Sequence, residues 1–268
     1  MALRLAIMGG GRIGSAITAG LLEASWCEPP ELAVVEIDSA RRAELSHEHP
    51  GLVVVDTLEL AHVDRYTGAV LAVKPDVAEG AARLLGAVGV RRILSVVAGL
   101  STQRIEAVLP DGAAVVRAMP NMPVLVRRGV SAISGGSHVT SDDLDWADGV
   151  LGSLGGVVRL AERHLDIVTG LSGSMPGYLF LVVEALIEAG VLQGLPREVA
   201  AALVAGTLEG TGALLSASGE PPEVLRAQVT SPGGTTAAGL RALESRAVRS
   251  AFIEAVAAAT ERSRQLGR

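Results

Sequence analysis

Three glycines with the spacing Gly9-x-Gly11-x-x-Gly14 constrain the fold of this chain more than any other feature. They follow the apolar run Leu3 to Met8 and precede Ser15 to Ala24, so the segment predicts a strand, a tight turn and a helix. In such a unit the first glycine permits the turn, the second lets a pyrophosphate approach the backbone, and the third lets helix and strand pack closely. We therefore predict a dinucleotide-binding unit; the alternative is a glycine-rich turn that binds nothing. The residues expected to bind the cofactor here are Gly9, Gly11, Arg12, Ile13 and Gly14.

An acidic residue ends the next predicted strand. Glu36 follows Leu32 to Val35, where a carboxylate usually accepts a hydrogen bond from the ribose 2′-hydroxyl of the cofactor. Such a carboxylate repels a 2′-phosphate, which favours NADH over NADPH. Arg41 and Arg42 follow and are candidates to meet a phosphate, so the preference between NADH and NADPH stays open. The alternative for Glu36 is ordinary surface polarity in a loop.

Strand and helix patterns alternate as far as about residue 160, which predicts a mostly parallel sheet with helices on both faces. Ser101 is the expected N-cap of one of the helices. The last strand, Val130 to Ser134, is expected at an edge of the sheet. The other predicted strands are Leu52 to Val55, Ala69 to Val73, Arg92 to Val97 and Ala114 to Ala118; the helices between them are Arg41 to His47, Val77 to Ala87 and Ser101 to Val108.

From Asp166 onward the strand signals stop and only helical patterns remain. We predict an α/β domain of the dinucleotide-binding type over residues 1–160, followed by an all-α domain over 161–268 that packs tightly against it. The predicted helices are Asp166 to Gly173, Pro176 to Ala189, Pro196 to Ser216, Pro222 to Val229, Thr235 to Glu244 and Ala247 to Leu266.

The chain is unusually apolar, with a mean hydropathy of +0.41. No apolar run is expected to reach the roughly 18–20 residues of a membrane span, because Glu184 and Glu188 interrupt the most apolar helix, Tyr178 to Leu192. High apolarity without a span favours a helical surface buried between subunits over a merely Ala- and Val-rich core. The net charge of −6 argues against a nucleic-acid partner, since phosphate binding needs a basic face.

The cysteine and histidine residues argue against an internal disulfide and against a metal site. The single cysteine, Cys27, cannot form an internal disulfide, which fits a reducing compartment. Met1 to Arg4 lead directly into a strand and do not resemble a signal peptide, so we expect a cytoplasmic location. The five histidines, His62 among them, lack acidic or cysteine neighbours at ligand spacing, and no metal site is expected.

The segment Thr230-Ser231-Pro232-Gly233-Gly234-Thr235-Thr236 lies between two predicted helices. Proline fixes φ and glycine removes the Cβ barrier, so successive N–H groups can turn toward one point at a helix N-terminus. Such a corner suits a small anion, for instance a carboxylate. The alternative is a helix–helix turn in which Thr235 or Thr236 is the N-cap.

Taken together, these segments resemble pyrroline-5-carboxylate reductase, and the resemblance runs nearly end to end. Thr230 to Thr236 matches the Thr-Ser-Pro-Gly-Gly-Thr-Thr motif of that family residue for residue. The other matching segments are Ile7 to Ala16, Leu71 to Pro75, Ser95 to Leu100, Arg117 to Pro123, Leu171 to Tyr178 and Leu240 to Glu244.

The resemblance implies a fold, an assembly and a reaction. The fold is a Rossmann domain followed by a helical domain that interlocks in a homodimer, and in this family dimers often assemble into rings. The reaction is hydride transfer from NAD(P)H to the C=N carbon of a cyclic imino acid, with the substrate between the nicotinamide of one subunit and the helical bundle of the dimer.

The resemblance also assigns roles to individual residues. The Thr236 hydroxyl would hydrogen-bond the ring nitrogen, and the corner would hold the substrate carboxylate. Substrate-binding residues would then be Ser174, Met175, Ser231, Gly233, Gly234 and Thr235. Further cofactor-binding residues would be Ala72, Val73, Lys74, Pro75, Ala98, Gly99 and Asn121, of which Lys74 is the only lysine of the chain.

Three positions depart from the family pattern. Met175 stands where the family has Gly, Gly177 where it has Ala, and Met122 where it has Thr. A methionine in place of glycine adds a flexible apolar side chain and restricts φ, so a related substituted or six-membered imine is an alternative substrate. A dinucleotide-binding sensor without turnover is a second alternative. A β-hydroxyacid dehydrogenase is a third, disfavoured because its chemistry needs a lysine in the second domain.

Overall fold

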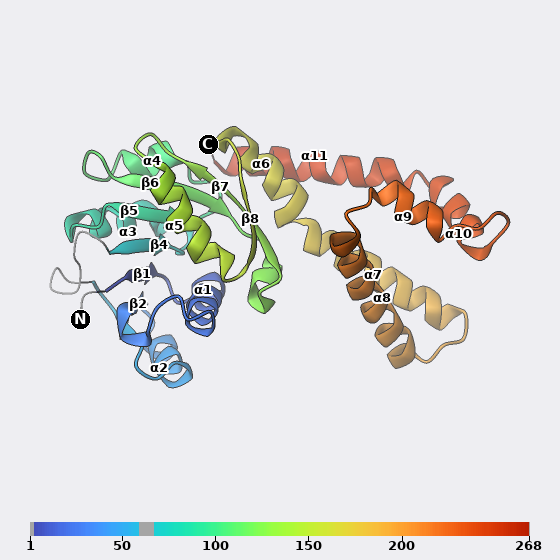
Figure 1. Ribbon diagram of the computed structural model, residues 1–268, viewed down its shortest axis with the longest axis horizontal. Helices are drawn as coiled ribbons and strands as arrows, with labels where there is room; N and C mark the ends of the chain where they lie inside the picture. Colours follow the sequence, from blue (N-terminus) through green and yellow to red (C-terminus); the bar gives the residue numbers. More distant parts are fainter. Residues whose placement is uncertain (1–2, 59–66, 268) are drawn as a thin grey trace. The chain divides into compact units, whose positions relative to one another are not determined.

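The computed structural model describes residues 3–58 and 67–267, and it divides into two compact units. The first comprises Met1–Ser174 together with Ala258–Arg268, and the second is Met175–Ala257. Figure 1 shows their elements. The last strand ends at Arg159 and the first unit continues to Ser174, so the domain boundary at residue 160 stays a prediction.

In the described part of the chain, eight strands form one sheet in the order β3-β2-β1-β4-β5-β6-β7-β8. The pairs from β3 through β6 are parallel, β7 runs antiparallel to β6, and β8 runs parallel to β7. The expected mostly parallel sheet is therefore confirmed. The strands are β1 (Leu5–Met8), β2 (Leu32–Val35), β3 (Val53–Val55), β4 (Gly68–Leu71), β5 (Arg92–Ser95), β6 (Ala114–Met119), β7 (Gly129–Gly135) and β8 (Gly155–Arg159).

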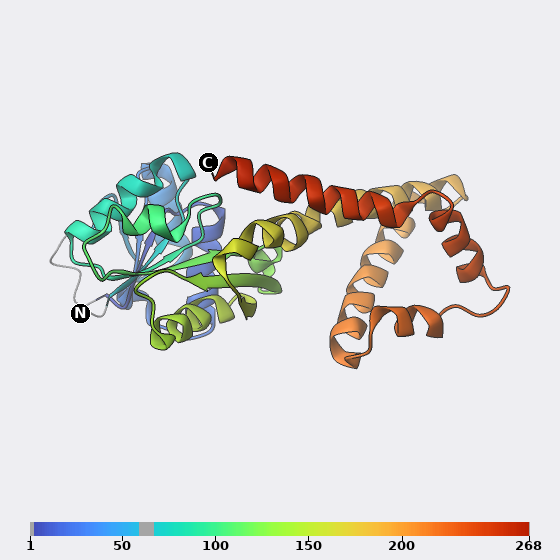
Figure 2. The same ribbon diagram turned by 90° about the horizontal axis from the view of Figure 1, so that it is seen from above.

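Helices cover both faces of this sheet because its strands are apolar on both sides. In β1, Leu5 and Ile7 point into one core cluster, while Ala6 and Met8 point into the other, as the two-residue period of a strand requires. The first cluster is completed by α1 (Arg12–Glu23), α2 (Ser39–Glu48) and α5 (Ser141–Gly152), and the second by α3 (Pro75–Ala87) and α4 (Thr102–Glu106). Figure 2 shows α3 and α4 on one side of the sheet and α5 on the other.

The expected strands and helices before residue 135 are present, and Ser101 is the N-cap of α4, accepting from the Arg104 N–H. Two elements were missed. Helix α5 begins with a capping box in which Thr140 and Asp143 exchange hydrogen bonds, a local signal that could have found it. The strand β8 opens with two glycines and pairs with β7, so the expectation that β7 is an edge strand was wrong; β8 takes that place.

The second unit is helical, as expected. Its elements are α7 (Met175–Leu192), α8 (Arg197–Ser218), α9 (Pro222–Gln228), α10 (Thr235–Glu244) and the first part of α11 (Val248–Leu266). The chain before it forms α6 (Leu165–Val168) and a π-helical turn over Thr169–Gly173, both in the first unit. Short 3-10 turns cover Pro29–Glu31, Met122–Val126 and Glu162–His164.

Among the residues that the structure describes, two helical segments are long and apolar enough to cross a membrane by length and composition alone. They are Glu162–Leu192, with a mean hydropathy of 1.7, and Arg197–Ser218, with 1.4. The expectation that no apolar segment reaches this length was therefore wrong, because two glutamates are too few to interrupt the first. Phe180, Leu181 and Leu203 are more than half exposed in the single chain. So much exposed apolar surface indicates a face that another molecule covers.

Candidate active site

The glycine loop has the geometry of a phosphate cradle. Gly9 has a φ of +105°, and a Cβ there would lie 2.7 Å from the Ala72 carbonyl oxygen. A Cβ at Gly14 would overlap the Gly9 carbonyl oxygen. Gly11, the N-cap of α1, is different, because a Cβ there would meet no heavy atom within 4 Å. The first and third glycines thus allow close packing, while the second leaves an open backbone face at a helix N-terminus, where anions bind.

The two residues after Gly11 have different environments. Arg12 is exposed at the first position of α1, whereas Ile13 packs partly against the first core cluster. An exposed guanidinium at this position suits a phosphate group. The Ile13 side chain packs against the core, so only its backbone is open to a ligand.

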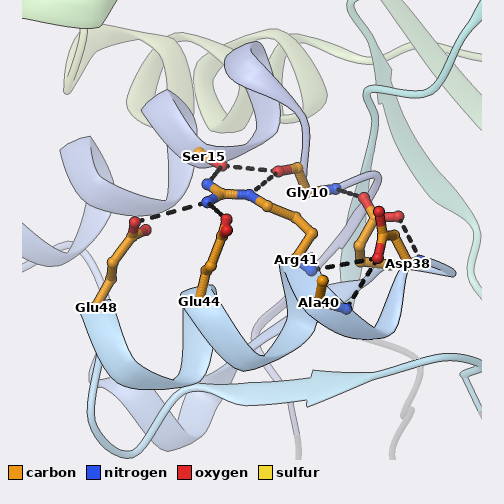
Figure 3. Close-up of polar contacts among 8 residues, drawn as sticks. Gly10, Ser15, Asp38, Ala40, Arg41, Glu44 and Glu48 are labelled. Carbon is orange, nitrogen blue, oxygen red and sulfur yellow. Dashed lines mark hydrogen bonds and ion pairs between the residues drawn. The ribbon is translucent and has the colours of Figure 1, made fainter.

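Glu36 holds the glycine loop and the turn after β2 together. Its Oε2 accepts from the Gly10 N–H at 2.8 Å, and its Oε1 accepts from the Asp38 N–H at 3.0 Å. Figure 3 labels the two partners of this carboxylate, Gly10 and Asp38. Each carboxylate oxygen retains a further lone pair for a ribose hydroxyl. Because two backbone N–H groups bind this carboxylate, the Glu36 side chain is fixed in place, which argues against the alternative that it is an ordinary polar surface residue.

The second expected cofactor loop continues directly from β4. The Ala72 N–H donates to the Met8 carbonyl at 2.9 Å, and Val73 packs partly against the second core cluster. Lys74 is exposed and is the N-cap of α3, and Pro75 takes the first helical position. Proline favours that position because its missing N–H would have no partner there. The lysine thus stands at the carboxyl end of a central strand, where ligands of such sheets bind.

Ala98 and Gly99 form a turn after β5, and Gly99 has a φ of +72°. The end of α11 lies against this turn, because a Cβ at Gly99 would come within 3.2 Å of the Leu266 carbonyl oxygen. A hollow of about 400 Å³ lies beside it, lined by Gly99, Ser101, Arg117, Arg163, Asp166, Arg264 and Gly267.

An ion pair between Arg117 and Glu162, which the sequence did not predict, fixes one of the side chains that line this hollow. The buried Arg117 guanidinium lies 3.1 Å from Glu162 Oε1. The hydroxyl and the N–H of Thr102 donate to the same carboxylate at 2.7 and 2.9 Å. Burial raises the pKa of Glu162, but these hydrogen bonds from Thr102 and Arg117 outweigh it and the net pKa is lowered. The carboxylate therefore ties α4 to the chain that follows β8.

Asn121 connects two of the motif segments. Its Oδ1 accepts from the Val130 N–H at 2.9 Å, and its Nδ2 donates to Ser172 Oγ at 3.3 Å. Ser172 belongs to the π-helical turn, and the Ser174 N–H closes that turn on the Thr169 carbonyl. Such π turns occur frequently at functional sites.

The Thr-Ser-Pro-Gly-Gly corner ends in an open helix N-terminus. Gly233 has a φ of +69°, and the Gly234 N–H donates to the Ser231 carbonyl at 3.0 Å. Gly234 is the N-cap of α10, so Thr235 and Thr236 are its first two residues and neither is the cap. A hollow of about 320 Å³ at this corner is lined by Gly233, Gly234, Ala237, Ala238 and Arg241. Free N–H groups and a guanidinium at one hollow suit a carboxylate.

The three departures from the family pattern lie at open positions. Met122 and Met175 begin their helices and are 48% and 38% exposed. A Cβ at Gly177 would meet no heavy atom within 4 Å. Neither methionine is needed to fill a core, so packing does not explain them.

Comparisons with known proteins match the two parts of the chain to two family models. A family model described as pyrroline-5-carboxylate reductase dimerisation matches residues 162–266, and one described as NADP oxidoreductase coenzyme F420-dependent matches residues 4–99. Pyrroline-5-carboxylate reductase of Synechocystis sp. is 42% identical and covers 100% of both chains. The enzyme of that name from Corynebacterium melassecola is 39% identical over 98% of each.

Solved structures agree along the whole chain. A pyrroline-5-carboxylate reductase from Coxiella burnetii superposes with a TM-score of 0.91 at 29% identity, covering 100% of both chains. A pyrroline carboxylate reductase from Plasmodium falciparum, with NADP bound, has a TM-score of 0.85 at 30% identity and covers 99% of this chain and 98% of its own.

Proposed function

The chain belongs to the pyrroline-5-carboxylate reductase family, and we infer from this premise that it reduces the C=N bond of 1-pyrroline-5-carboxylate to give L-proline. It is an NAD(P)H-dependent oxidoreductase of proline biosynthesis. The observation that carries this function is the 42% identity to a named reductase over the full length of both chains.

The reaction makes modest demands on acid–base chemistry. NAD(P)H, when bound, would supply a hydride for a C–H bond at the imine carbon, with the C=N π electrons moving to nitrogen. If the ring nitrogen is already protonated, the product is a neutral secondary amine and no strong general acid is needed. The protein's contribution is placement, since donor and acceptor must align at about 3–3.5 Å.

We propose that the glycine loop, the Ala72–Pro75 segment, the Ala98–Gly99 turn and Asn121 bind the cofactor. The supporting observations are the open Gly11 backbone, the exposed Arg12 at the start of α1 and the exposed Lys74 at the start of α3. The fit of a dinucleotide rests on the open backbone at Gly11, where a side chain would stand in the cradle, and on Gly9 and Gly14, where a side chain would clash with the loop itself.

We propose further that the corner from Ser231 to Thr235 binds the substrate carboxylate and that the Thr236 hydroxyl bonds the ring nitrogen; Ser174 and Met175 are assigned to the substrate by their motif. The support for the corner is the left-handed Gly233, the open N-terminus of α10 and Arg241 in the same hollow.

The test compares Thr236→Val with Thr236→Ser in a steady-state assay that follows loss of reduced nicotinamide and formation of proline. The valine variant should lose about 10- to 100-fold in kcat/KM, equivalent to about 1.5–3 kcal/mol for one hydrogen bond to a charged group. The serine variant should keep most of the activity, and both should bind NADH as the wild type does. Equal activity of all three proteins would remove Thr236 from the mechanism.

A homodimer is the assembly that the dimerisation domain supports. We propose that a second copy of the chain covers the exposed apolar faces of α7 and α8, and that the resulting dimers join into a ring. We also propose that the protein is cytoplasmic and has no membrane-bound form. Light scattering of protein released without detergent should give at least twice the monomer mass. Recovery only with detergent would contradict the protein–protein assignment.

A second substrate is favoured by one observation, the exposed Met175 at the start of α7. If this side chain reshapes the pocket, a substituted or six-membered cyclic imine should rival pyrroline-5-carboxylate. Met175→Gly should then shift kcat/KM toward pyrroline-5-carboxylate. A large preference for pyrroline-5-carboxylate in the wild type would dispose of this alternative.

A further inference from the structure

Side chains hold both polar groups of Gly10, the residue at the centre of the glycine loop. Its N–H donates to Glu36 Oε2 at 2.8 Å. Its carbonyl accepts from Arg41 Nε at 3.0 Å and from Ser15 Oγ at 2.9 Å. Arg41 Nη2 also donates to Ser15 Oγ at 2.7 Å, so the three side chains form one network around Gly10 (Figure 3). The loop conformation is thus fixed from both sides by residues outside its own motif.

The remaining nitrogen of Arg41 is also occupied. Its Nη1 lies 2.7 Å from Glu44 Oε2 and 3.6 Å from Glu48 Oε1, both on its own helix α2. The hydrogen bond with Glu44 raises the pKa of Arg41. All three guanidinium nitrogens are therefore engaged, and two carboxylates balance the charge.

Arg42, the second cation after Glu36, is bonded to backbone. Its Nη1 donates to the carbonyls of Glu36 and Ile37 at 2.9 and 2.8 Å. It thereby holds the turn that presents the Glu36 carboxylate. The two arginines that the sequence offers for a 2′-phosphate are thus both committed to protein groups.

On the basis of the proposed function, we propose that Arg41 is a positioning residue of the glycine loop and that Glu36 makes this chain selective for NADH over NADPH. The selectivity follows because both neighbouring arginines are bonded to protein groups. A 2′-phosphate would place negative charge beside the Glu36 carboxylate. To neutralise it, Arg41 would have to leave Gly10, Ser15 and two carboxylates. The solved relative from Plasmodium falciparum holds NADP, so the selectivity is argued from this chain's own residues.

The selectivity is tested by calorimetric titration of the full-length protein with NADH and with NADPH. Repulsion between the Glu36 carboxylate and a 2′-phosphate near the protein surface should make the Kd for NADPH about 10-fold or more higher than the Kd for NADH. Glu36→Gln, which keeps the side-chain shape, should bring the two Kd values within about 3-fold of one another. Tighter binding of NADPH by the wild type would overturn the proposal, whereas failure to bind either nucleotide would instead defeat the proposed function.

The role of Arg41 is tested with three further variants. Arg41→Ala should weaken NADH and NADPH by the same factor, with KM for NADH raised and kcat retained. The double variant Glu44→Gln, Glu48→Gln removes both carboxylates from Arg41 Nη1 and should strengthen NADPH relative to NADH. Arg159→Ala is the matched control, because Arg159 also pairs with two carboxylates, Asp145 and Asp148, but on β8 at the far end of the sheet order; it should leave both Kd values unchanged.

Two results would contradict the positioning role. One is a selective loss of NADPH binding in Arg41→Ala, which would make Arg41 a phosphate ligand. The other is an Arg41→Ala protein that binds both nucleotides as tightly as the wild type. Thermal unfolding of each variant separates a folding defect from a binding defect. Arg41→Lys, which keeps the charge without the forked geometry, should recover only part of the affinity that Arg41→Ala loses.

Discussion

Replacing Gly14 by alanine should damage both the fold of the glycine loop and its affinity for the cofactor. The added Cβ would overlap the Gly9 carbonyl oxygen and lie 3.4 Å from Ile7 Cγ2. Gly9 has no room to retreat, because it already packs closely on the Ala72 carbonyl. Relief therefore requires α1 to move away from β1 by roughly 1 Å, since overpacked sites respond by backbone shifts.

The magnitude follows from that displacement. Overpacking of this kind costs about 1–3 kcal/mol of unfolding free energy. A loop displaced by this amount also loses at least one backbone hydrogen bond to a charged phosphate, worth about 1.5–3 kcal/mol, or a roughly 10- to 100-fold rise in Kd. Urea denaturation of the free protein measures the first effect, and NADH titration measures the second.

Two other glycines provide matched controls. Gly11→Ala adds a methyl group with no heavy atom within 4 Å, so the free protein should change by no more than about 0.5 kcal/mol while NADH binding weakens, because the methyl stands on the open cradle. Gly80→Ala lies in α3 with equally open space and should stabilise the protein by about 1 kcal/mol without affecting binding. If Gly14→Ala matched the wild type in both assays, the close-approach argument would be refuted.

Three further outcomes are expected. Lys74→Gln should raise the Kd for NADH about 10-fold with little change in kcat, if the exposed amine meets a cofactor phosphate; unchanged binding would remove Lys74 from the site. The folded-state pKa of Glu162 is lowered below its ordinary 4.5, so its stabilisation is complete above that pH and is lost as the pH falls through the folded pKa. Denaturation across a pH series should therefore show the wild type losing about 1–2 kcal/mol of its advantage over Glu162→Gln on acidification. Burial raises the pKa of the Cys27 thiol to about 11, so mass spectrometry should find Cys27 unalkylated by iodoacetamide at neutral pH until the protein unfolds.

Local patterns were enough to establish the architecture of the first half of the chain. A glycine that must adopt a positive φ, an apolar run of strand length and a capping serine such as Ser101 each act within a few residues. The turn at Gly233 and Gly234 could likewise be predicted, because the residue types that favour a turn before a helix lie within a few positions of one another. Of the two elements that were missed, α5 carries a local signal in its capping box, whereas β8 begins with Gly155 and Gly156 and forms only by pairing with β7.

Contacts between residues far apart in the chain were decided only by the tertiary structure. The sequence identified Glu36 and Arg41 as candidate ribose and phosphate ligands, but not that both bind Gly10, which lies 26 and 31 positions away. It identified a very apolar helix, α7, and favoured a helical surface buried between subunits, but only the fold shows that Phe180 and Leu181 are among the side chains exposed in the single chain. Whether a charge is free to bind a ligand, and whether an apolar face is already covered, depends on which other groups the fold brings within a few ångströms, and no local periodicity encodes that.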